Sequence, residues 1–169
     1  MTANDIEKLT IVECYEDIAP HVTDIVEASD ANRDSLGFFP RSVFDDFARR
    51  RGLLVLLIYD ASGTRYAGHL LFQRQFPRAS ILQLYIDAKF RGRGFARILC
   101  NRVAETLTSE GFLSIYARVA EDLTAANIRW EGLGFLVQRV VPGGATTGRM
   151  IVVRVRELLA YNGLDPIAI

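Results

Sequence analysis

Basic residues and glycines alternate along residues 89–97, and this spacing suits the binding of an anion. Four basic side chains fall within the stretch, and no acidic residue offsets them between positions 89 and 101: they are Lys89, Arg91, Arg93 and Arg97. Gly92 and Gly94 remove side chains from the chain between these cations, so that successive backbone N–H groups can approach one polyanion. The stretch therefore predicts a site for a phosphate-bearing ligand.

The residues that follow predict the helix that positions this site. Apolar residues recur at every fourth position between Gly94 and Gly111, which is the spacing of one helix face: Phe95, Leu99, Val103 and Leu107. The first turn of a helix carries unpaired N–H groups and a partial positive charge, which disfavours nearby cations. A bound anion would relieve that repulsion.

Two common phosphate-binding motifs fit this segment poorly. A P-loop needs Gly-Lys followed by Ser or Thr, and this run is missing after the glycines. A dinucleotide-binding fingerprint needs Gly or Ala at the position of Arg97. A solvated helix start without a ligand is the remaining alternative, and it leaves the clustered charge uncompensated.

Strand and helix patterns surround this segment. Apolar or alternating runs predict strands at 9–12, 53–59, 66–74, 80–86, 112–117, 135–141 and 150–155. Further helices are expected after Pro20, from Ser42 to just before Gly52, and over 122–132. The first four strands should be antiparallel, and a right-handed crossover through the long helix should make the fourth and fifth parallel. We therefore expect an α+β fold over residues 1–169: one domain with a mixed, mostly antiparallel sheet of about seven strands and helices on both faces.

Composition narrows the class of protein. Half of the 169 residues are hydrophobic and 20 basic residues balance 20 acidic ones, which is typical of a globular chain without a global charge for nucleic acid or membranes. Cys14 and Cys100 are far apart and lack neighbouring ligands, so neither a disulfide nor a metal site is expected. We find no signal-peptide or membrane-span pattern, and expect a cytoplasmic protein.

Three consecutive arginines, Arg49 to Arg51, allow two interpretations. They resemble a nucleic-acid patch, but cations in a last helical turn just before Gly52 also complement the helix dipole. The second interpretation explains their position, so nucleic acid is not the expected partner.

The run Arg91-Gly92-Arg93-Gly94-Phe95-Ala96 follows a hydrophobic strand and opens an amphipathic helix. In this setting it resembles the acetyl-coenzyme A (acetyl-CoA) signature of the GNAT superfamily of N-acetyltransferases. Arg91, Gly94 and Ala96 match the family pattern Gln/Arg-x-x-Gly-x-Gly/Ala. A late helix ending in Leu133-Gly134-Phe135 is a second similarity, and the order of strands and helices extends the resemblance over nearly the whole chain.

The resemblance implies an N-acetyltransferase that moves the acetyl group of acetyl-CoA directly to an amine. Backbone N–H groups from Gly92 to Ala96 would bind the pyrophosphate, and the strand at 84–86 would pair with the pantetheine arm. A backbone N–H of that strand would also polarise the thioester carbonyl. The cofactor-binding residues that the resemblance implies are Leu84, Tyr85, Ile86, Arg91, Gly92, Arg93, Gly94, Phe95, Ala96, Asn127 and Trp130.

The chain departs from the family at its catalytic positions. Trp130 stands where family members commonly carry Tyr, and Leu123 where they carry Asn, for which Asn127 is the nearest replacement. Trp has no titratable proton to donate. Tyr116 and Tyr85 are candidate proton donors and His69 is a candidate general base, although each also fits a packed position on a strand.

Three functions remain open from the sequence. The first is acetylation of a small-molecule or peptide amine by a monomer or homodimer. The second, suggested by Trp130 and Leu123, is a catalytically degenerate module that binds acyl-CoA without turnover. The third, suggested by the arginine clusters, is a toxin-like acetyltransferase acting on charged transfer RNA. The acceptor should lie between 36–40 and 142–149, where Asp34 is the one nearby carboxylate.

Overall fold

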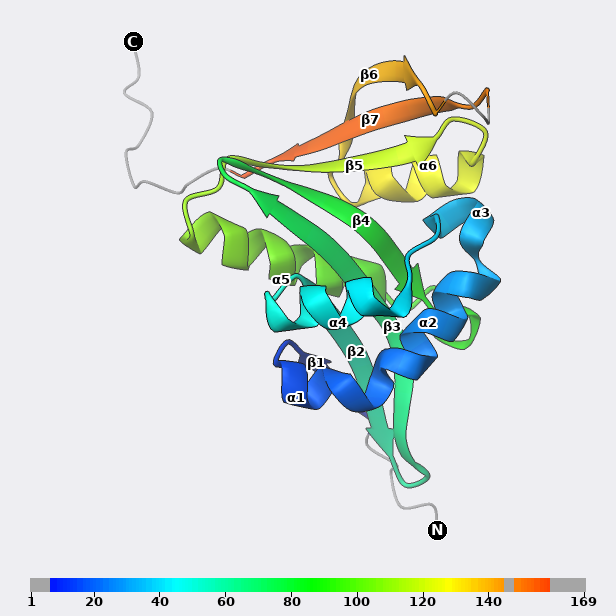
Figure 1. The fold of residues 1–169 in the computed structure, drawn as a ribbon, viewed down its shortest axis with the longest axis vertical. Helices are drawn as coiled ribbons and strands as arrows, with labels where there is room; N and C mark the ends of the chain where they lie inside the picture. Colours follow the sequence, from blue (N-terminus) through cyan, green and yellow to red (C-terminus); the bar gives the residue numbers. More distant parts are fainter. Residues whose placement is uncertain (1–6, 145–147, 159–169) are drawn as a thin grey trace.

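A seven-stranded sheet forms the centre of the computed structural model, which describes residues 7–144 and 148–158 (Figure 1). Its strands are β1 Lys8–Val12, β2 Leu53–Asp60, β3 Gly63–Gln75, β4 Arg78–Ile86, β5 Ser114–Ala120, β6 Leu136–Pro142 and β7 Met150–Glu157. Their order across the sheet is β1-β2-β3-β4-β5-β7-β6. β4 and β5 are parallel, and every other neighbouring pair is antiparallel. The predicted mixed sheet, with its single parallel crossover, is confirmed.

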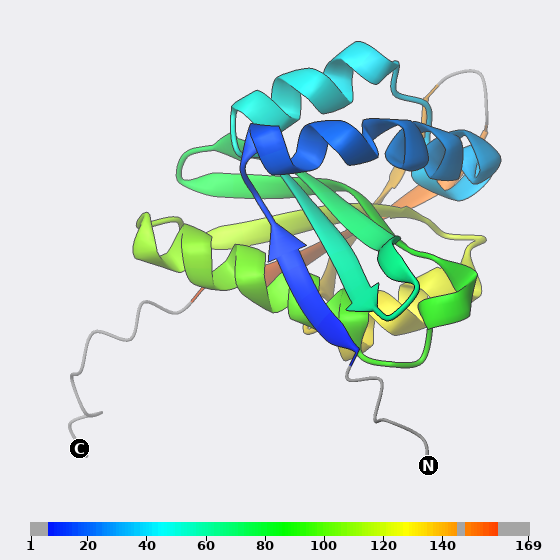
Figure 2. The same ribbon diagram turned by 90° about the horizontal axis from the view of Figure 1, so that it is seen from below.

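Helices cover both faces of this sheet (Figures 1 and 2). One face carries α1 Tyr15–Ile18, the short 3-10 helix η1 Ala19–His21, α2 Val22–Ala31, α3 Arg33–Leu36 and α4 Arg41–Arg49. The other face carries α5 Phe95–Ser109, which follows η2 Ala88–Phe90, and α6 Thr124–Gly132. The predicted α+β class is therefore confirmed. None of the described helices has the length and apolar character required to cross a membrane.

The unbroken apolar sequence of β2 follows from its position between two cores. Leu54, Leu56 and Ile58 pack into the core under α5, whereas Leu53 and Leu57 pack into the core under α2 and α4. Successive strand residues point to opposite faces, so a strand covered on both sides needs apolar residues throughout.

The long helix and the strand after it set the geometry of the crossover. Leu99, Val103 and Leu107 of α5 are buried, as their spacing predicts. The strand, predicted at 112–117, instead spans β5, because the N–H of Leu113 donates to the Pro77 carbonyl at 2.8 Å and still belongs to the turn. This shift brings residues 118–120 into the sheet.

The arginines at the end of α4 have structural partners. The Arg49 guanidinium lies 3.9 Å from the centre of the Tyr15 ring, and Arg50 pairs with Asp46 at 3.0 Å. Arg51 has a positive φ of 56° and follows the end of the helix. These contacts support the interpretation of the run as a helix terminus.

Candidate active site

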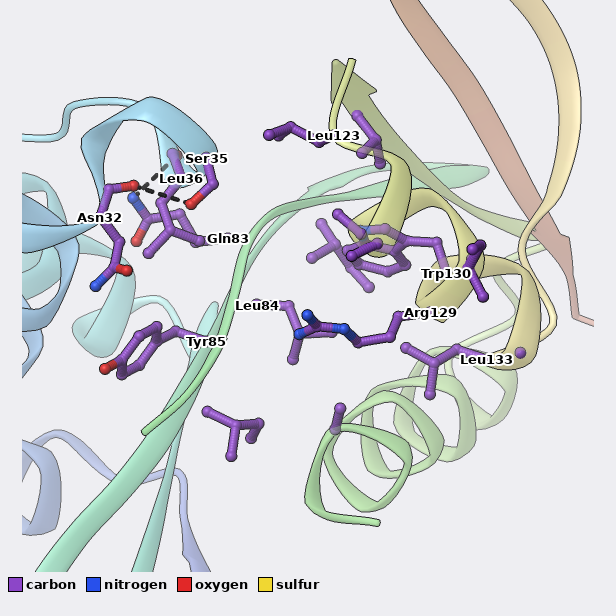
Figure 3. A pocket seen from close by; sticks show the side chains of 18 of the residues that line it. Asn32, Ser35, Leu36, Gln83, Leu84, Tyr85, Leu123, Arg129, Trp130 and Leu133 are labelled. Carbon is purple, nitrogen blue, oxygen red and sulfur yellow. Dashed lines mark hydrogen bonds between the residues drawn. The ribbon is translucent and has the colours of Figure 1, made fainter. Parts of the chain in front are cut away.

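A cleft of about 820 Å³ lies where β4 and β5 separate. The two parallel strands pair from Arg78↔Ser114 to Ile81↔Ala117, after which β4 continues to Ile86 and β5 to Ala120. The cleft is lined by β4, the end of β5, the start of α5, α6 and the corner between α2 and α3. Figure 3 shows this corner on one side, α6 on the other, and Leu84 of β4 between them. The structure thus contains the gap between strands that the resemblance implies.

A β-bulge in β4 marks the start of the gap. Leu71 of β3 pairs with Gln83 and the next residue, Phe72, pairs with Ile81, so Leu82 is the extra residue. A bulge bends its strand and interrupts the hydrogen-bond ladder. Beyond it, β5 no longer pairs with β4, and the backbone groups on that edge of β4 are suited to bind an extended, amide-bearing chain.

The first turn of α5 opens into the same cleft. Gly94 is the N-cap, with a φ of 78° that glycine adopts without strain. Within the described residues no side chain caps this helix, which leaves the N–H groups of Phe95, Ala96 and Arg97 available to a ligand. Gly94 and Ala96 line the cleft. An anion bound there would meet several N–H groups and the positive end of the helix dipole.

Arg91 is one of the predicted cations, and it faces the cleft beside the first turn of α5. Its Nε donates to the Ile86 carbonyl at 2.9 Å, the side chain lines the cleft, and no carboxylate in the described residues pairs with it. Arg93 instead pairs with Glu7, and its guanidinium lies 4.8 Å from the centre of the Phe95 ring. The positive charge of Arg93 is thus already balanced by a carboxylate.

Three arginines fix the C-terminal end of α6, which forms one wall of the cleft. They donate to three carbonyls at or just after that end: Arg97 to Gly132 at 2.9 Å, Arg156 to Leu133 at 3.4 Å and Arg154 to Phe135 at 2.9 Å. Cations at a helix C-terminus compensate unpaired carbonyls and the negative end of the dipole. Because these side chains come from α5 and β7, they hold α6 against both elements. Trp130 of α6 lies against the core and lines the cleft.

The opposite wall is the corner between α2 and α3. Three of its residues face the cleft: Asn32, Ser35 and Leu36 (Figure 3). Arg149 connects this corner to the β5–α6 loop, since it donates to the Asp34 carbonyl at 3.0 Å and pairs with Asp122 at 2.8 Å. The Arg149 guanidinium lowers the pKa of the Asp122 carboxyl below its usual value. The carboxylate of Asp122 therefore has its counter-charge within the protein.

A buried chain of hydrogen bonds runs behind the cleft wall formed by the corner between α2 and α3, called the acceptor wall below. The Gln83 amide faces the Leu36 carbonyl at 3.2 Å and the Ser29 hydroxyl at 2.8 Å. The Leu36 carbonyl can only accept a hydrogen bond, so the amide nitrogen of Gln83 must face it. The amide oxygen of Gln83 therefore faces His69 and accepts from its Nε2–H at 3.0 Å. Nδ1 of His69 then accepts from the Tyr66 hydroxyl at 2.6 Å. These constraints fix His69 as the neutral Nε2–H tautomer.

Burial lowers the pKa of His69 from its usual 6.5 to about 4. In the unfolded chain the ring gains a proton near pH 6.5, whereas in the folded chain it stays neutral down to about pH 4. The unfolded state therefore binds more protons in this interval, and we expect the free energy of unfolding to fall by about 3 kcal/mol as the pH falls through it.

Urea unfolding between pH 7.5 and 4.5 tests this prediction. His69→Gln should show a shallower loss of stability with acid than the natural protein, whereas His21→Gln, which changes the other histidine of the sequence, should retain the steep loss. Parallel pH profiles for the natural protein and His69→Gln would contradict it.

Neither His69 nor Tyr116 lines the cleft, whereas Tyr85 does. His69 is fully buried and both ring nitrogens are hydrogen-bonded within the protein. Tyr116 is half-buried, and its hydroxyl accepts from Nε2 of Gln138 on the edge strand at 3.3 Å. The cleft thus brings neither phenol nor imidazole of this pair to a substrate.

The residues that the resemblance assigns to the cofactor divide into two groups. Those that line the cleft are Leu84, Tyr85, Ile86, Arg91, Gly94, Ala96 and Trp130. Those outside its lining are Gly92, Arg93, Phe95 and Asn127. Asn127 donates to the Ala120 and Leu123 carbonyls at 2.9 and 3.1 Å, so its amide joins α6 to the preceding loop.

Sequence patterns did not identify several residues of the cleft wall. Asn32, Arg118, Asp122 and Arg129 line it but belong to no recognisable motif. Arg118 falls one residue beyond the predicted end of its strand, and extending the period-two alternation of Tyr116 would have placed it on the same face. Asn32, Asp122 and Arg129 come from helix ends and a loop. No sequence pattern indicates where such residues lie relative to a cleft.

Comparison with known proteins supports the fold. A family model described as the acetyltransferase (GNAT) family matches residues 15–135. A chain of the NatC complex bound to Gag peptide and CoA is similar at a TM-score of 0.76 and 14% identity, covering 90% of this chain and 99% of that one. The yncA protein of Salmonella typhimurium, solved with acetyl-CoA, has a TM-score of 0.70 and 17% identity, and the match covers 94% of this chain and 99% of that one.

A third similar structure is the ribosomal-protein-S18-alanine N-acetyltransferase from Escherichia coli. Its TM-score is 0.66 at 13% identity, over 95% of this chain and 99% of that chain. No curated protein matches the sequence. At such identities the structures establish a common fold, and the family model spans well over half of the chain. The chain therefore belongs to the acetyltransferase (GNAT) family.

Proposed function

We propose that the protein transfers the acetyl group of acetyl-CoA directly to an amine, which is a small molecule or a peptide. The observation that carries the proposal is the uncapped first turn of α5, which opens into a cleft that has the unpaired edge of β4 as one wall. Neighbouring folds solved with acetyl-CoA, or with CoA and a peptide, support the same pair of ligands.

The residues present fit acetyl-CoA along the length of the cleft. The N–H groups of Phe95 to Arg97 and the guanidinium of Arg91 would hold the diphosphate, since they combine donors with positive charge. The edge of β4 at 84–86 would pair with the amides of the pantetheine arm. Trp130 and Leu133 would cover that arm from α6. When bound, acetyl-CoA supplies an acetyl group activated as a thioester.

The chain's own contribution to the transfer is orientation rather than proton transfer by His69 or Tyr116. His69 would position the acceptor wall, because it holds Gln83 and through it the Leu36 carbonyl. A thiol of pKa about 8.5 leaves without a strong acid. Backbone N–H groups at the bulge of β4 would polarise the thioester carbonyl, which requires no particular side chain.

A binding module without turnover is the second candidate. It is favoured by the position of His69 and Tyr116 outside the cleft and by Trp130 within it. Such a module would still hold acetyl-CoA through α5 and β4, so cofactor binding alone does not separate the two functions.

Two measurements on the purified protein test the proposal. Acetyl-CoA at about 100 times its Kd should stabilise the fold by about 2.7 kcal/mol, which raises Tm by about 5 °C or more. Release of free thiol should then appear with at least one amine of a panel of amino acids, polyamines and short peptides. Stabilisation without thiol release on any amine would favour the binding module, and no stabilisation would refute both.

A further inference from the structure

Arg118 of β5 places in the cleft wall a guanidinium that has no partner among the described residues. It lines the cleft, is exposed, and forms neither an ion pair nor a hydrogen bond with any part of the chain that the structure describes. Arg91 and Arg97 also line the cleft, but both donate to backbone carbonyls. Arg129, which likewise has no ion-pair partner among the described residues, extends from α6 toward Leu84 on the cofactor side (Figure 3).

Arg118 points to the opposite face of the sheet from the proposed diphosphate site. Along β5, Ile115 and Ala117 belong to the core that packs against α5. Successive strand residues point to opposite faces, so Tyr116 and Arg118 point to the face that carries α2 to α4. The amides of α5 are on the first face, so Arg118 is on the side of the α2–α3 corner, where the acceptor is expected to enter.

Two further guanidinium groups share this face. Arg139 of β6 and Arg118 of β5 both pair in register with Val153 of the intervening β7, so they lie in one row across the sheet. The Arg78 guanidinium is 5.8 Å from the centre of the Tyr116 ring. Arg78 and Arg139 are exposed, and neither forms an ion pair within residues 7–144 and 148–158. In Figure 1, β5 to β7 extend beyond α1, α2 and α4, which cover the other half of the sheet.

Carboxylates among the described residues balance only part of this charge. Asp122 lines the cleft but is paired with Arg149 at 2.8 Å, and the Asp34 carboxylate also lies in the field of Arg149. Within the described strands β4 to β7, Glu157 is the one acidic residue. Its register opposite Ser114 places it on this face, two strands, or about 10 Å, from Arg78. The acceptor side of the cleft therefore has an excess of positive charge.

We propose that the acceptor amine belongs to a molecule bearing a carboxylate or phosphate group, and that Arg118 binds this oxyanion. The inference rests on the proposed function and names its substrate class. A guanidinium forms charge-assisted, bidentate hydrogen bonds with either oxyanion, and Arg78 and Arg139 add attraction at longer range. The same positive field disfavours an ammonium ion and favours the neutral amine that attacks the thioester.

Matched acceptor pairs test the proposal and separate the two oxyanions. Phosphoethanolamine is compared with ethanolamine, and alanine with alaninamide, at equal concentrations of the unprotonated amine. For each pair, binding to CoA-saturated protein is measured by calorimetry, and thiol release from acetyl-CoA is measured in parallel. The proteins are the natural chain, Arg118→Gln, and Arg50→Gln as the control for loss of an exposed cation at the end of α4.

The anionic member of at least one pair should bind CoA-saturated protein at least about tenfold more tightly than its neutral partner. That ratio should fall to about one in Arg118→Gln and persist in Arg50→Gln. Equal binding within both pairs, no binding of either anionic amine in the millimolar range, or a preference that survives Arg118→Gln would overturn the proposal. If the anionic amine binds more tightly but no thiol is released, the result would contradict the proposed transfer and would still support anion recognition by Arg118.

Discussion

Arg91→Glu is expected to weaken the binding of acetyl-CoA by about a hundredfold. The guanidinium lines the cleft beside the first turn of α5 and has no carboxylate partner among the described residues. A charge-assisted hydrogen bond contributes about 1.5–3 kcal/mol, and replacing the cation with an anion adds repulsion to the loss of that bond. Calorimetric titration with acetyl-CoA at two salt concentrations measures the effect, which should shrink at high salt because screening weakens the repulsion.

Two controls make this result specific. Arg91→Gln should show a smaller loss, since it removes the cation without adding an anion. Arg41→Glu changes the charge equally but lies at the first turn of α4, where a carboxylate suits the helix dipole, and should bind acetyl-CoA normally. Affinity retained in Arg91→Glu would show that the diphosphate does not occupy the start of α5.

The elements that depend on local periodicity could be predicted from the sequence. The face of α5 is buried at Leu99, Val103 and Leu107 because a helix packed on a sheet needs an apolar residue at each turn. The apolar run of β2 indicated a strand covered on both faces, and two separate cores cover it. The glycines before α5 marked its start, since Gly94 has the positive φ that the turn requires.

The partners of individual side chains could not be predicted in the same way. Four cations near α5 indicated an anion, but Arg93 pairs with Glu7 and Arg97 donates to the Gly132 carbonyl. Both partners are distant in sequence, and no local pattern identifies them. His69 has the intrinsic acidity of a general base, yet burial and two hydrogen bonds make it a neutral link between Tyr66 and Gln83.

The shape of the cleft depends on how closely β3 approaches β4, and this distance cannot be predicted from the sequence. Gly68 of β3 pairs with Ile86 of β4, three residues beyond the pair Leu71↔Gln83 at the bulge. This part of β4 no longer pairs with β5. There β3 is the only described strand that pairs with β4. The missing side chain at Gly68 thus allows the wall at 84–86 to adopt its observed path.

Gly68→Ala is therefore expected to lower the free energy of unfolding by about 3 kcal/mol and to weaken acetyl-CoA binding, because overpacking against backbone forces the strands apart. A Cβ at this position would lie 2.3 Å from the Tyr85 carbonyl oxygen and 2.9 Å from Cδ1 of Ile86. Gly144→Ala is the matched control, since a Cβ there meets nothing within 4 Å. Urea unfolding and calorimetry measure the two effects. Unchanged stability in Gly68→Ala would mean that β4 can move away from β3 freely, and the wall of the cleft would then not depend on this contact.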